Sequence, residues 1–283
     1  MTVKLVTDST SYIPEKTCRE LDIKMVNLGV NFPDESFDEN AVDYIDFYER
    51  IKREKVIPTS SQPSLGSIID TFREIIMREE EVLGIFISAK MSGTYESALH
   101  ARKILLEEYP QACIEVFDSK TNCMALGLQV VEAAAAARAG KKMEEVMQVA
   151  REIREKIRFY FVPESLEYLI KGGRIGGASA LLGSLLKIRP ILYVNDGMTD
   201  VKEKVRGTKA AIKRIVDLLQ EDADKYGLKH LLVHHIHDRE RADELARTLG
   251  QEYQREVPAL SIGPVIGLHV GPGTLAVVYC IDN

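Results

Sequence analysis

Residues 82–98, VLGIFISAKMSGTYESA, run from an apolar strand through a short polar loop into a helix that we expect to begin near Thr94. Such a strand-to-helix step is the repeating unit of α/β proteins. The loop holds two serines and a glycine, and the free N–H groups at a helix start attract anions such as carboxylate or phosphate. Because no base is evident nearby to activate a serine, the loop favours binding over catalysis. The alternative is that Ser92 simply caps the helix.

Strands and helices alternate on both sides of this stretch. Strand-like runs such as residues 3–8 and 113–119 are separated by helical patterns, which predicts a mostly parallel sheet. After Pro63, apolar residues spaced i, i+3, i+4 and i+7 predict one buried helix face, with Ser61 or Gln62 as the cap. The N-terminal half therefore has the pattern of a Rossmann-like α/β domain.

The character of the chain changes near residue 158. A hairpin with an Asn-Asp-Gly turn is expected at 191–204, and the last strand at 274–282. The expected fold class is α/β with two domains. The N-terminal domain, 1–158, would carry a mostly parallel sheet with flanking helices, and the C-terminal α/β domain, 159–283, a mixed sheet. We expect the ligand to lie between and within them.

The bulk composition excludes several classes of protein. The 283 residues are 45% hydrophobic and 28% charged, the balance of a soluble globular protein, and the net charge of −6 argues against a nucleic-acid partner. No export signal and no membrane-length apolar stretch is visible, so we expect no integral membrane association. The four cysteines have no CxxC spacing, which fits a reducing cytoplasm and neither a zinc knuckle nor a disulfide framework. They are Cys18, Cys113, Cys123 and Cys280.

Three hydroxyl-rich or glycine-rich loops follow predicted strands, at residues 6–11, 58–64 and 88–95. In an open α/β sheet the loops beyond the carboxyl ends of the strands converge on one crevice, where ligands bind. Each loop alone is ordinary helix-capping sequence, so the signal lies in their number and placement. The candidate ligand-binding hydroxyls are those of Ser60, Ser61 and Ser92.

A fourth candidate loop, residues 263–277, places His269 among four glycines and two prolines before the last strand. Glycine permits close approach of the main chain to a ligand. A lone histidine is more often structural, and the sequence leaves both interpretations open.

Small and apolar residues dominate residues 166–192, LEYLIKGGRIGGASALLGSLLKIRPIL. A helix with a small-residue face packs tightly against a neighbour, but it can equally leave a channel for an apolar guest. The glycines lack the G-x-G-x-x-G spacing of a phosphate loop. The apolar residues that would line such a channel are Leu181, Leu182, Leu185, Leu186 and Ile188.

Two further clusters of polar side chains have ordinary structural interpretations. His235 and His237 would share one face of a strand with Asp238 behind them, but no recognised metal-ligand spacing completes the set, so we expect no metal. The basic run 202–214 is typical of a solvated face, although an acidic partner surface could bind there.

The chain contains, in this order, the motifs VTDST, TSSQPS, SAKMSGTYESA, VFDS, LEYLIKGGRI, RPIL, VRGTKA and IGPVIGLHVGPG. With these motifs in this order, the sequence resembles the DegV family of bacterial fatty-acid-binding proteins. The resemblance covers nearly the full length. It implies two α/β domains, a long-chain fatty acid with a buried tail and its carboxylate at the domain junction, and no other cofactor. It also implies a non-catalytic carrier, since some members present the acyl carboxylate to an ATP-dependent fatty acid kinase for phospholipid synthesis.

The resemblance also assigns residues. Ser92, the Gly93 amide and the hydroxyl of Ser60 should face the carboxylate, with His269 and Val270 nearby. Position 60 departs from the family, which usually has Thr there; the hydroxyl is kept, but the β-methyl that restricts its rotamer is lost.

Three further candidate residues complete the set. Ser61 is included as a neighbouring carboxylate-binding hydroxyl. Arg174 and Arg206 match positions that face the kinase in the family.

Three alternatives remain open at this point. The first is a serine-dependent hydrolase or acyltransferase with Ser92 as nucleophile and His269 as base, although no GxSxG motif is present. The second is a binding protein for a phosphate ligand at the three loops. The third is a metal protein built on His235 and His237.

Overall fold

The computed structural model describes residues 2–181 and 189–282. The contacts divide the chain into two compact units. Unit 1 comprises Met1–Asn31, Ser36–Asn40 and Ser60–Glu155, and unit 2 comprises Phe32–Glu35, Ala41–Thr59 and Lys156–Asn283. The sequence did not indicate that segments near residues 32 and 50 would group with the C-terminal unit. The expected domains, 1–158 and 159–283, stay a prediction.

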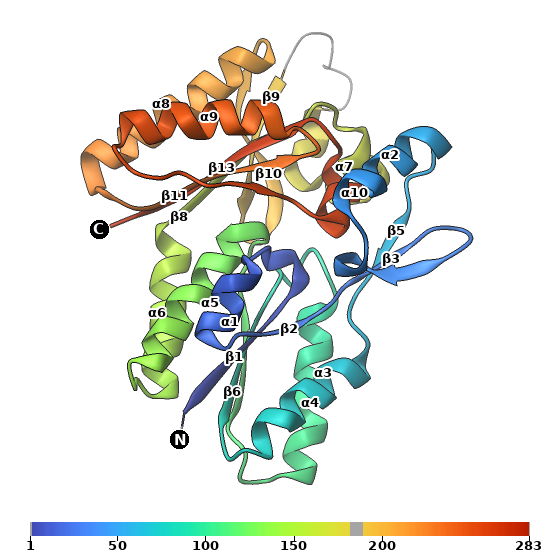
Figure 1. Cartoon of the computed structure of the whole chain (residues 1–283), viewed down its shortest axis with the longest axis vertical. Helices are drawn as coiled ribbons and strands as arrows, with labels where there is room; N and C mark the ends of the chain where they lie inside the picture. The colour runs from blue at the N-terminus through green and yellow to red at the C-terminus, as the bar shows by residue number, and fades with distance from the viewer. Residues whose placement is uncertain (1, 182–188, 283) are drawn as a thin grey trace. The chain divides into compact units, whose positions relative to one another are not determined.

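Unit 1 is built on a four-stranded parallel sheet, as the alternation of strands and helices predicted. The strand order is β2-β1-β6-β7, so β1 and β6 lie in the centre (Figure 1). The strands are β1 (Val3–Asp8), β2 (Lys24–Val26), β6 (Glu81–Phe86) and β7 (Ile114–Asp118).

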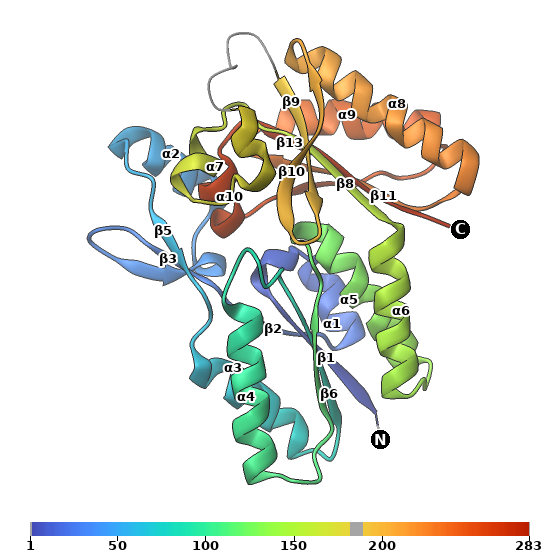
Figure 2. The ribbon, with the colours of Figure 1, turned by 180° about the vertical axis from the view of Figure 1, so that it is seen from behind.

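Helices cover both faces of this sheet (Figures 1 and 2). On one face, α3 and α4 bury Phe72, Ala98 and Leu105 against strand residues such as Val82 and Phe86, because their apolar residues recur at helical spacing. On the other face, α5 packs against β1 and α1. The helices are α1 (Glu15–Leu21), α3 (Leu65–Ile76), α4 (Thr94–Glu108), α5 (Cys123–Arg138) and α6 (Met143–Lys156).

A small sheet of order β4-β3-β5 lies beside these layers, with β3 at Gly29–Asn31, β4 at Ser36–Asp38 and β5 at Thr59–Ser61. The candidate loop at 58–64 therefore does not follow a strand. It follows helix α2 (Tyr44–Glu54) and contains a strand itself, because its hydroxyl residues pair with β3.

Unit 2 contains a mixed six-stranded sheet of order β10-β9-β8-β13-β11-β12, as expected for the C-terminal half. Its pairings are antiparallel except for β11 with β12. The strands are β8 (Ile157–Val162), β9 (Arg189–Asn195), β10 (Met198–Val205), β11 (Leu228–Ile236), β12 (Ala259–Ser261) and β13 (Thr274–Ile281). The predicted hairpin is formed by β9 and β10.

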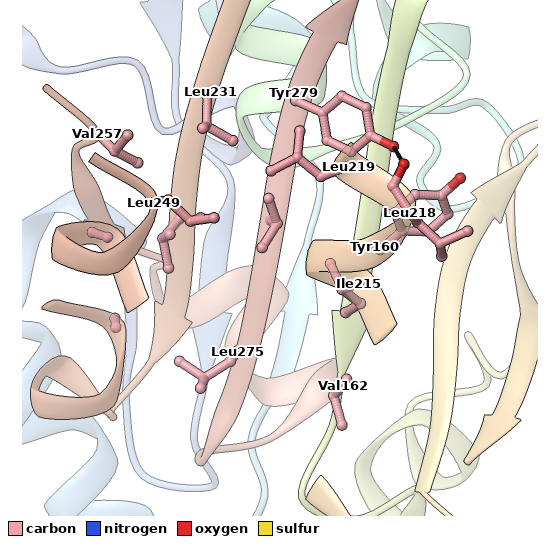
Figure 3. Packing of buried hydrophobic residues seen from close by; sticks show 14 of the residues in the cluster. Tyr160, Val162, Ile215, Leu218, Leu219, Leu231, Leu249, Val257, Leu275 and Tyr279 are labelled. Atoms are coloured by element: carbon pink, nitrogen blue, oxygen red, sulfur yellow. Dashed lines mark hydrogen bonds between the residues drawn. The ribbon is translucent and has the colours of Figure 1, made fainter. Parts of the chain in front are cut away.

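Two long helices, α8 (Thr208–Tyr226) and α9 (Arg239–Glu252), cover one face of this sheet. Figure 3 shows how Ile215 and Leu219 of α8 and Leu249 of α9 pack against Leu275 and Tyr279 of β13 and neighbouring strands. Unit 2 also contains shorter elements, among them α7 (Glu167–Lys171), the 3-10 helix η3 (Gly176–Leu181) and α10 (Pro264–Val270). Of these, η3 contacts β10 and α10 contacts α7.

Three further sequence predictions about local structure were wrong. The loop expected around His269 is largely helix α10. The small-residue run is not one helix but α7 and η3; of its expected apolar lining, Leu181 is buried, whereas the other four residues lie outside the described ranges. Helix α3 is capped by Ser64, whose hydroxyl accepts the Ser67 N–H, and not by either residue expected.

In the described parts of the chain, no helix is both long enough and apolar enough to cross a membrane.

Candidate functional site

A buried carboxylate joins two of the predicted loops in unit 1. Asp8 ends β1, and its carboxylate accepts the N–H groups of Thr10 at 3.0 Å and Ile87 at 2.7 Å, and the Thr10 hydroxyl at 2.5 Å. Complete burial raises the pKa of Asp8 to about 6 despite these donors. The loops that follow β1 and β6 are thus tied together at the carboxyl edge of the sheet.

Gln62 brings the third predicted loop to the same region of unit 1. Its Nε2 donates to Ser97 Oγ in the first turn of α4 at 2.5 Å. A Cβ placed on Gly93 would lie 2.0 Å from Gln62 Oε1, so a larger residue at position 93 would require the Gln62 side chain to shift. The segment after β5 and the start of α4 therefore lie side by side.

The two serines of β5 point in different directions. Ser61 lies against β3, since a Cβ on Gly29 would come within 2.6 Å of the Ser61 Oγ. Successive residues of a strand point to opposite faces of the sheet, so the side chains of Ser60 and Ser61 lie on opposite faces of the β4-β3-β5 sheet.

The Ser92 hydroxyl lies at the start of α4, whose N-cap residue is Gly93. Its Oγ accepts the Thr94 N–H at 3.3 Å and lies 2.9 Å from Thr94 Oγ1. The capping interpretation is thus correct in one respect, because the Ser92 hydroxyl satisfies an N–H of the first turn. Both bonds go to a threonine, which is not a base.

His269 lies in the last turn of α10 in unit 2, followed by Val270. Its imidazole is packed closely on α7, because a Cβ on Gly172 would lie 2.3 Å from His269 Nδ1. Burial, with the positive charge of Arg174 as a smaller cause, lowers the pKa of His269 to about 4. At neutral pH the imidazole is therefore uncharged, with one N–H donor and one acceptor nitrogen.

The predicted partner-facing arginines also lie in unit 2, and both are exposed. Arg174 donates to the Gly172 carbonyl at 2.6 Å. Arg206 lines a cavity of about 780 Å³ and makes no hydrogen bond or ion pair with any residue of the described ranges. We call it the α7 cavity.

The α7 cavity combines an apolar lining with charge. Its other cations are paired, Arg189 with Glu164 at 2.7 Å and Lys171 with Glu167 at 2.6 Å. Its apolar lining comes from Pro163, Leu166, Ile170 and Pro190.

Contrary to the expectation from the sequence, His235 and His237 do not share one face of a strand. His235 is buried, whereas His237 follows the strand with a φ of 50° and lies 3.1 Å from Glu49. Within the described ranges no group of three or more candidate ligands could hold a metal ion.

Unit 2 has a second cavity of about 280 Å³, in which Ser261 lies beside His235. The Nδ1 atom of His235 accepts the Asp238 N–H at 3.2 Å, so the ring proton is on Nε2 and points to Ser261 Oγ at 3.1 Å. A histidine that donates to a serine does not deprotonate it, and this pair is not a catalytic dyad.

Sequence reasoning missed Asp8 and Gln62, although both belong to loops that it selected, because hydrogen-bond partners cannot be read from a loop sequence. The close fit of Gly172 to His269 left no signal in the sequence beyond an abundance of glycine.

The candidate residues divide between the two units. Unit 1 carries Ser60, Ser61, Ser92 and Gly93, and unit 2 carries Arg174, Arg206, His269 and Val270. The role of each stays a prediction.

Comparison with known proteins gives consistent matches over the whole chain. A sequence model of the family described as "Uncharacterised protein, DegV family COG1307" matches residues 2–282. A DegV domain-containing protein of Clostridium acetobutylicum is 47% identical over 283 residues, covering 100% of this chain and 99% of that protein.

Solved structures share the fold. The crystal structure of DegV, a fatty acid binding protein from Bacillus subtilis, matches with a TM-score of 0.89 and 34% identity, covering 100% of both chains. The structure of a stearic acid-binding protein from Eubacterium ventriosum matches with a TM-score of 0.88 and 25% identity, covering 98% of each chain.

Proposed function

The chain belongs to the DegV family, and on this premise we propose that it binds a long-chain fatty acid whose acyl tail is buried and whose carboxylate is hydrogen-bonded. Two similar structures, from Bacillus subtilis and Eubacterium ventriosum, are described as fatty-acid-binding and stearic acid-binding proteins. The C-terminal unit would hold the tail.

The observation that carries the proposal is the link from Gln62 to the start of α4. It supports a set of neutral donors, the hydroxyls of Ser60 and Ser92 and the Gly93 amide, as the carboxylate site. Removing a carboxylate from water costs several kcal/mol unless such donors replace its hydration. In unit 2, the uncharged imidazole of His269 offers one N–H donor.

The tail would supply most of the affinity. About fourteen methylenes at ~0.8 kcal/mol each offer on the order of 11 kcal/mol of transfer free energy before the costs of binding are subtracted. The head-group residues would then fix orientation more than they add affinity. Neutral hydroxyls also suit release of the cargo, since a bidentate arginine would hold the carboxylate more strongly.

We further propose that the protein is a non-catalytic cytoplasmic carrier that presents the bound fatty acid to a fatty acid kinase in phospholipid metabolism. Arg206 supports a partner-facing role, because it is exposed, unpaired within the described ranges, and borders the α7 cavity. The two hydrogen bonds of Ser92 to Thr94 favour binding over the hydrolase alternative.

Native mass spectrometry of gently purified protein, followed by lipid extraction, tests the binding proposal. We expect a co-purified long-chain fatty acid. Protein that is consistently empty and has no affinity for such acids would contradict the proposal. Stoichiometric labelling of Ser92 by a fluorophosphonate would contradict the non-catalytic role.

The variant Ser92→Ala tests the head-group assignment. Loss of one hydroxyl donor to the carboxylate should weaken binding about fivefold to tenfold and impair phosphorylation by a kinase more strongly. The control is Ser67→Ala on α3, whose hydroxyl donates to the Ser64 carbonyl at 3.0 Å in the same unit. Equal affinity and turnover of the two variants would refute the assignment of Ser92.

A further inference from the structure

We propose that Tyr48 of α2 is a positioning residue for His269, and that it acts through helix α10. The proposal rests on the proposed function for its biological meaning, because His269 matters there as a head-group residue. All of the residues involved belong to unit 2. Helices α2 and α10 lie side by side in both views (Figures 1 and 2).

The hydroxyl of Tyr48 binds the start of α10. It donates to the carbonyl oxygens of Gly263 at 3.1 Å and of Ile262 at 3.3 Å, and Gly263 is the N-cap residue of the helix. The Gly263 carbonyl also accepts the Gly267 N–H at 2.9 Å, so the first helical hydrogen bond and the tyrosine share one oxygen. Tyr48 is only 3% exposed, and its ring therefore cannot move aside into solvent.

The Tyr48 ring also determines which residue fits in the middle of α10. A Cβ on Gly267 would lie 1.6 Å from the tyrosine oxygen and 2.7 Å from Cζ. The helix backbone therefore rests directly on the ring, with no side chain between them. A rotation of α10 about its axis would bring a larger side chain against Tyr48.

The other end of α10 is held by α7. A Cβ on Gly271, the C-cap residue, would lie 2.5 Å from the Tyr168 ring, and a Cβ on Gly172 would lie 2.3 Å from His269 Nδ1. Contacts at both ends thus set the position of the imidazole.

These contacts decide the position of His269 because α10 has little stability of its own. It is seven residues long, and isolated helices shorter than about twelve residues are marginal in water. Its N-cap residue is a glycine that makes no side-chain cap bond. Pro264 favours the first turn of α10, and Tyr48 adds a contact from a distant part of the sequence.

Tyr48→Phe tests the proposal, because it removes the hydroxyl and keeps the ring. The matched control is Tyr279→Phe, which removes another buried tyrosine hydroxyl of unit 2, one that donates to Asp222 at 2.7 Å. Nuclear magnetic resonance of labelled histidine in lipid-free protein would follow the titration of His269. We expect Tyr48→Phe to move its midpoint upward from about 4 by about half a pH unit or more, toward the ordinary value, as its burial loosens.

Fatty acid affinity gives the second measurement. We expect Tyr48→Phe to weaken binding about threefold to tenfold, and Tyr279→Phe to leave it unchanged. Gly267→Ala disturbs the same contact from the side of the helix, and it should shift the titration midpoint of His269 in the same direction.

The outcomes separate the two proposals. An unchanged His269 midpoint in a folded Tyr48→Phe protein, or an equal shift in Tyr279→Phe, would overturn the positioning role. Failure of the unmodified protein to bind any fatty acid would instead refute the proposed function, while the titration of His269 would still report on the role of Tyr48.

Discussion

The buried carboxylate of Asp8 should make unit 1 less stable as pH rises. Its pKa is about 6 in the folded protein, against an ordinary value of 3.8. Between these values the folded state binds more protons than the unfolded state, so the free energy of unfolding falls with increasing pH. A difference of about 2.2 pH units, at 1.36 kcal/mol each, corresponds to about 3 kcal/mol lost between pH 3.8 and well above pH 6.

The substitution Asp8→Asn isolates this contribution. Asparagine does not ionise, so the variant should lack this part of the pH dependence. It should nevertheless be less stable at low pH. The Asp8 oxygens accept the N–H groups of Thr10 and Ile87, and in the variant one of these two N–H groups would face the amide NH₂ of asparagine, which does not accept a hydrogen bond. The stability difference between the two proteins should therefore shrink by about 2.4 kcal/mol from pH 4 to pH 7.

Urea unfolding followed by circular dichroism measures this difference, since the chain has no tryptophan to report by fluorescence. Carbon-detected magnetic resonance of the Asp8 carboxyl gives the folded-state pKa directly. A stability difference that stays constant between pH 4 and pH 7, or a carboxyl that titrates near 3.8, would refute the reasoning.

Three other predictions concern single positions. Gly93→Ala should destabilise unit 1 by about 1–3 kcal/mol, because its Cβ would meet Gln62 Oε1, and calorimetry should show recovery when Gln62→Ala is added. Arg206→Glu should leave fatty acid binding unchanged and lower kinase turnover; equal turnover would remove the arginine from the partner surface. Burial lowers the pKa of His234 to about 4, so acidification from pH 6.5 to pH 4 should destabilise unit 2, and a His234→Gln protein should lack that part of the acid sensitivity in a thermal melt.

Local sequence patterns predicted the elements whose stability comes from long apolar faces or from turn chemistry. The start of α4 at Thr94 and the β9–β10 hairpin agree with the structure. Periodicity decides such elements because each buries its own face. The same reasoning selected the loops of Ser60 and Ser92, but it could not separate Ser60 from Ser61, since the pairing of β5 with β3 decides which face of the small sheet each hydroxyl occupies.

The sequence by itself determined the α/β class, the parallel and mixed sheets and, through ordered motifs, the family. Tertiary structure alone decided that the segment around His269 is a helix and that α2 groups with unit 2. The physical reason is the range of the interactions involved. Helix α10 is short and has a glycine at each cap position, and the Tyr48 hydroxyl that holds it comes from more than two hundred positions away along the chain.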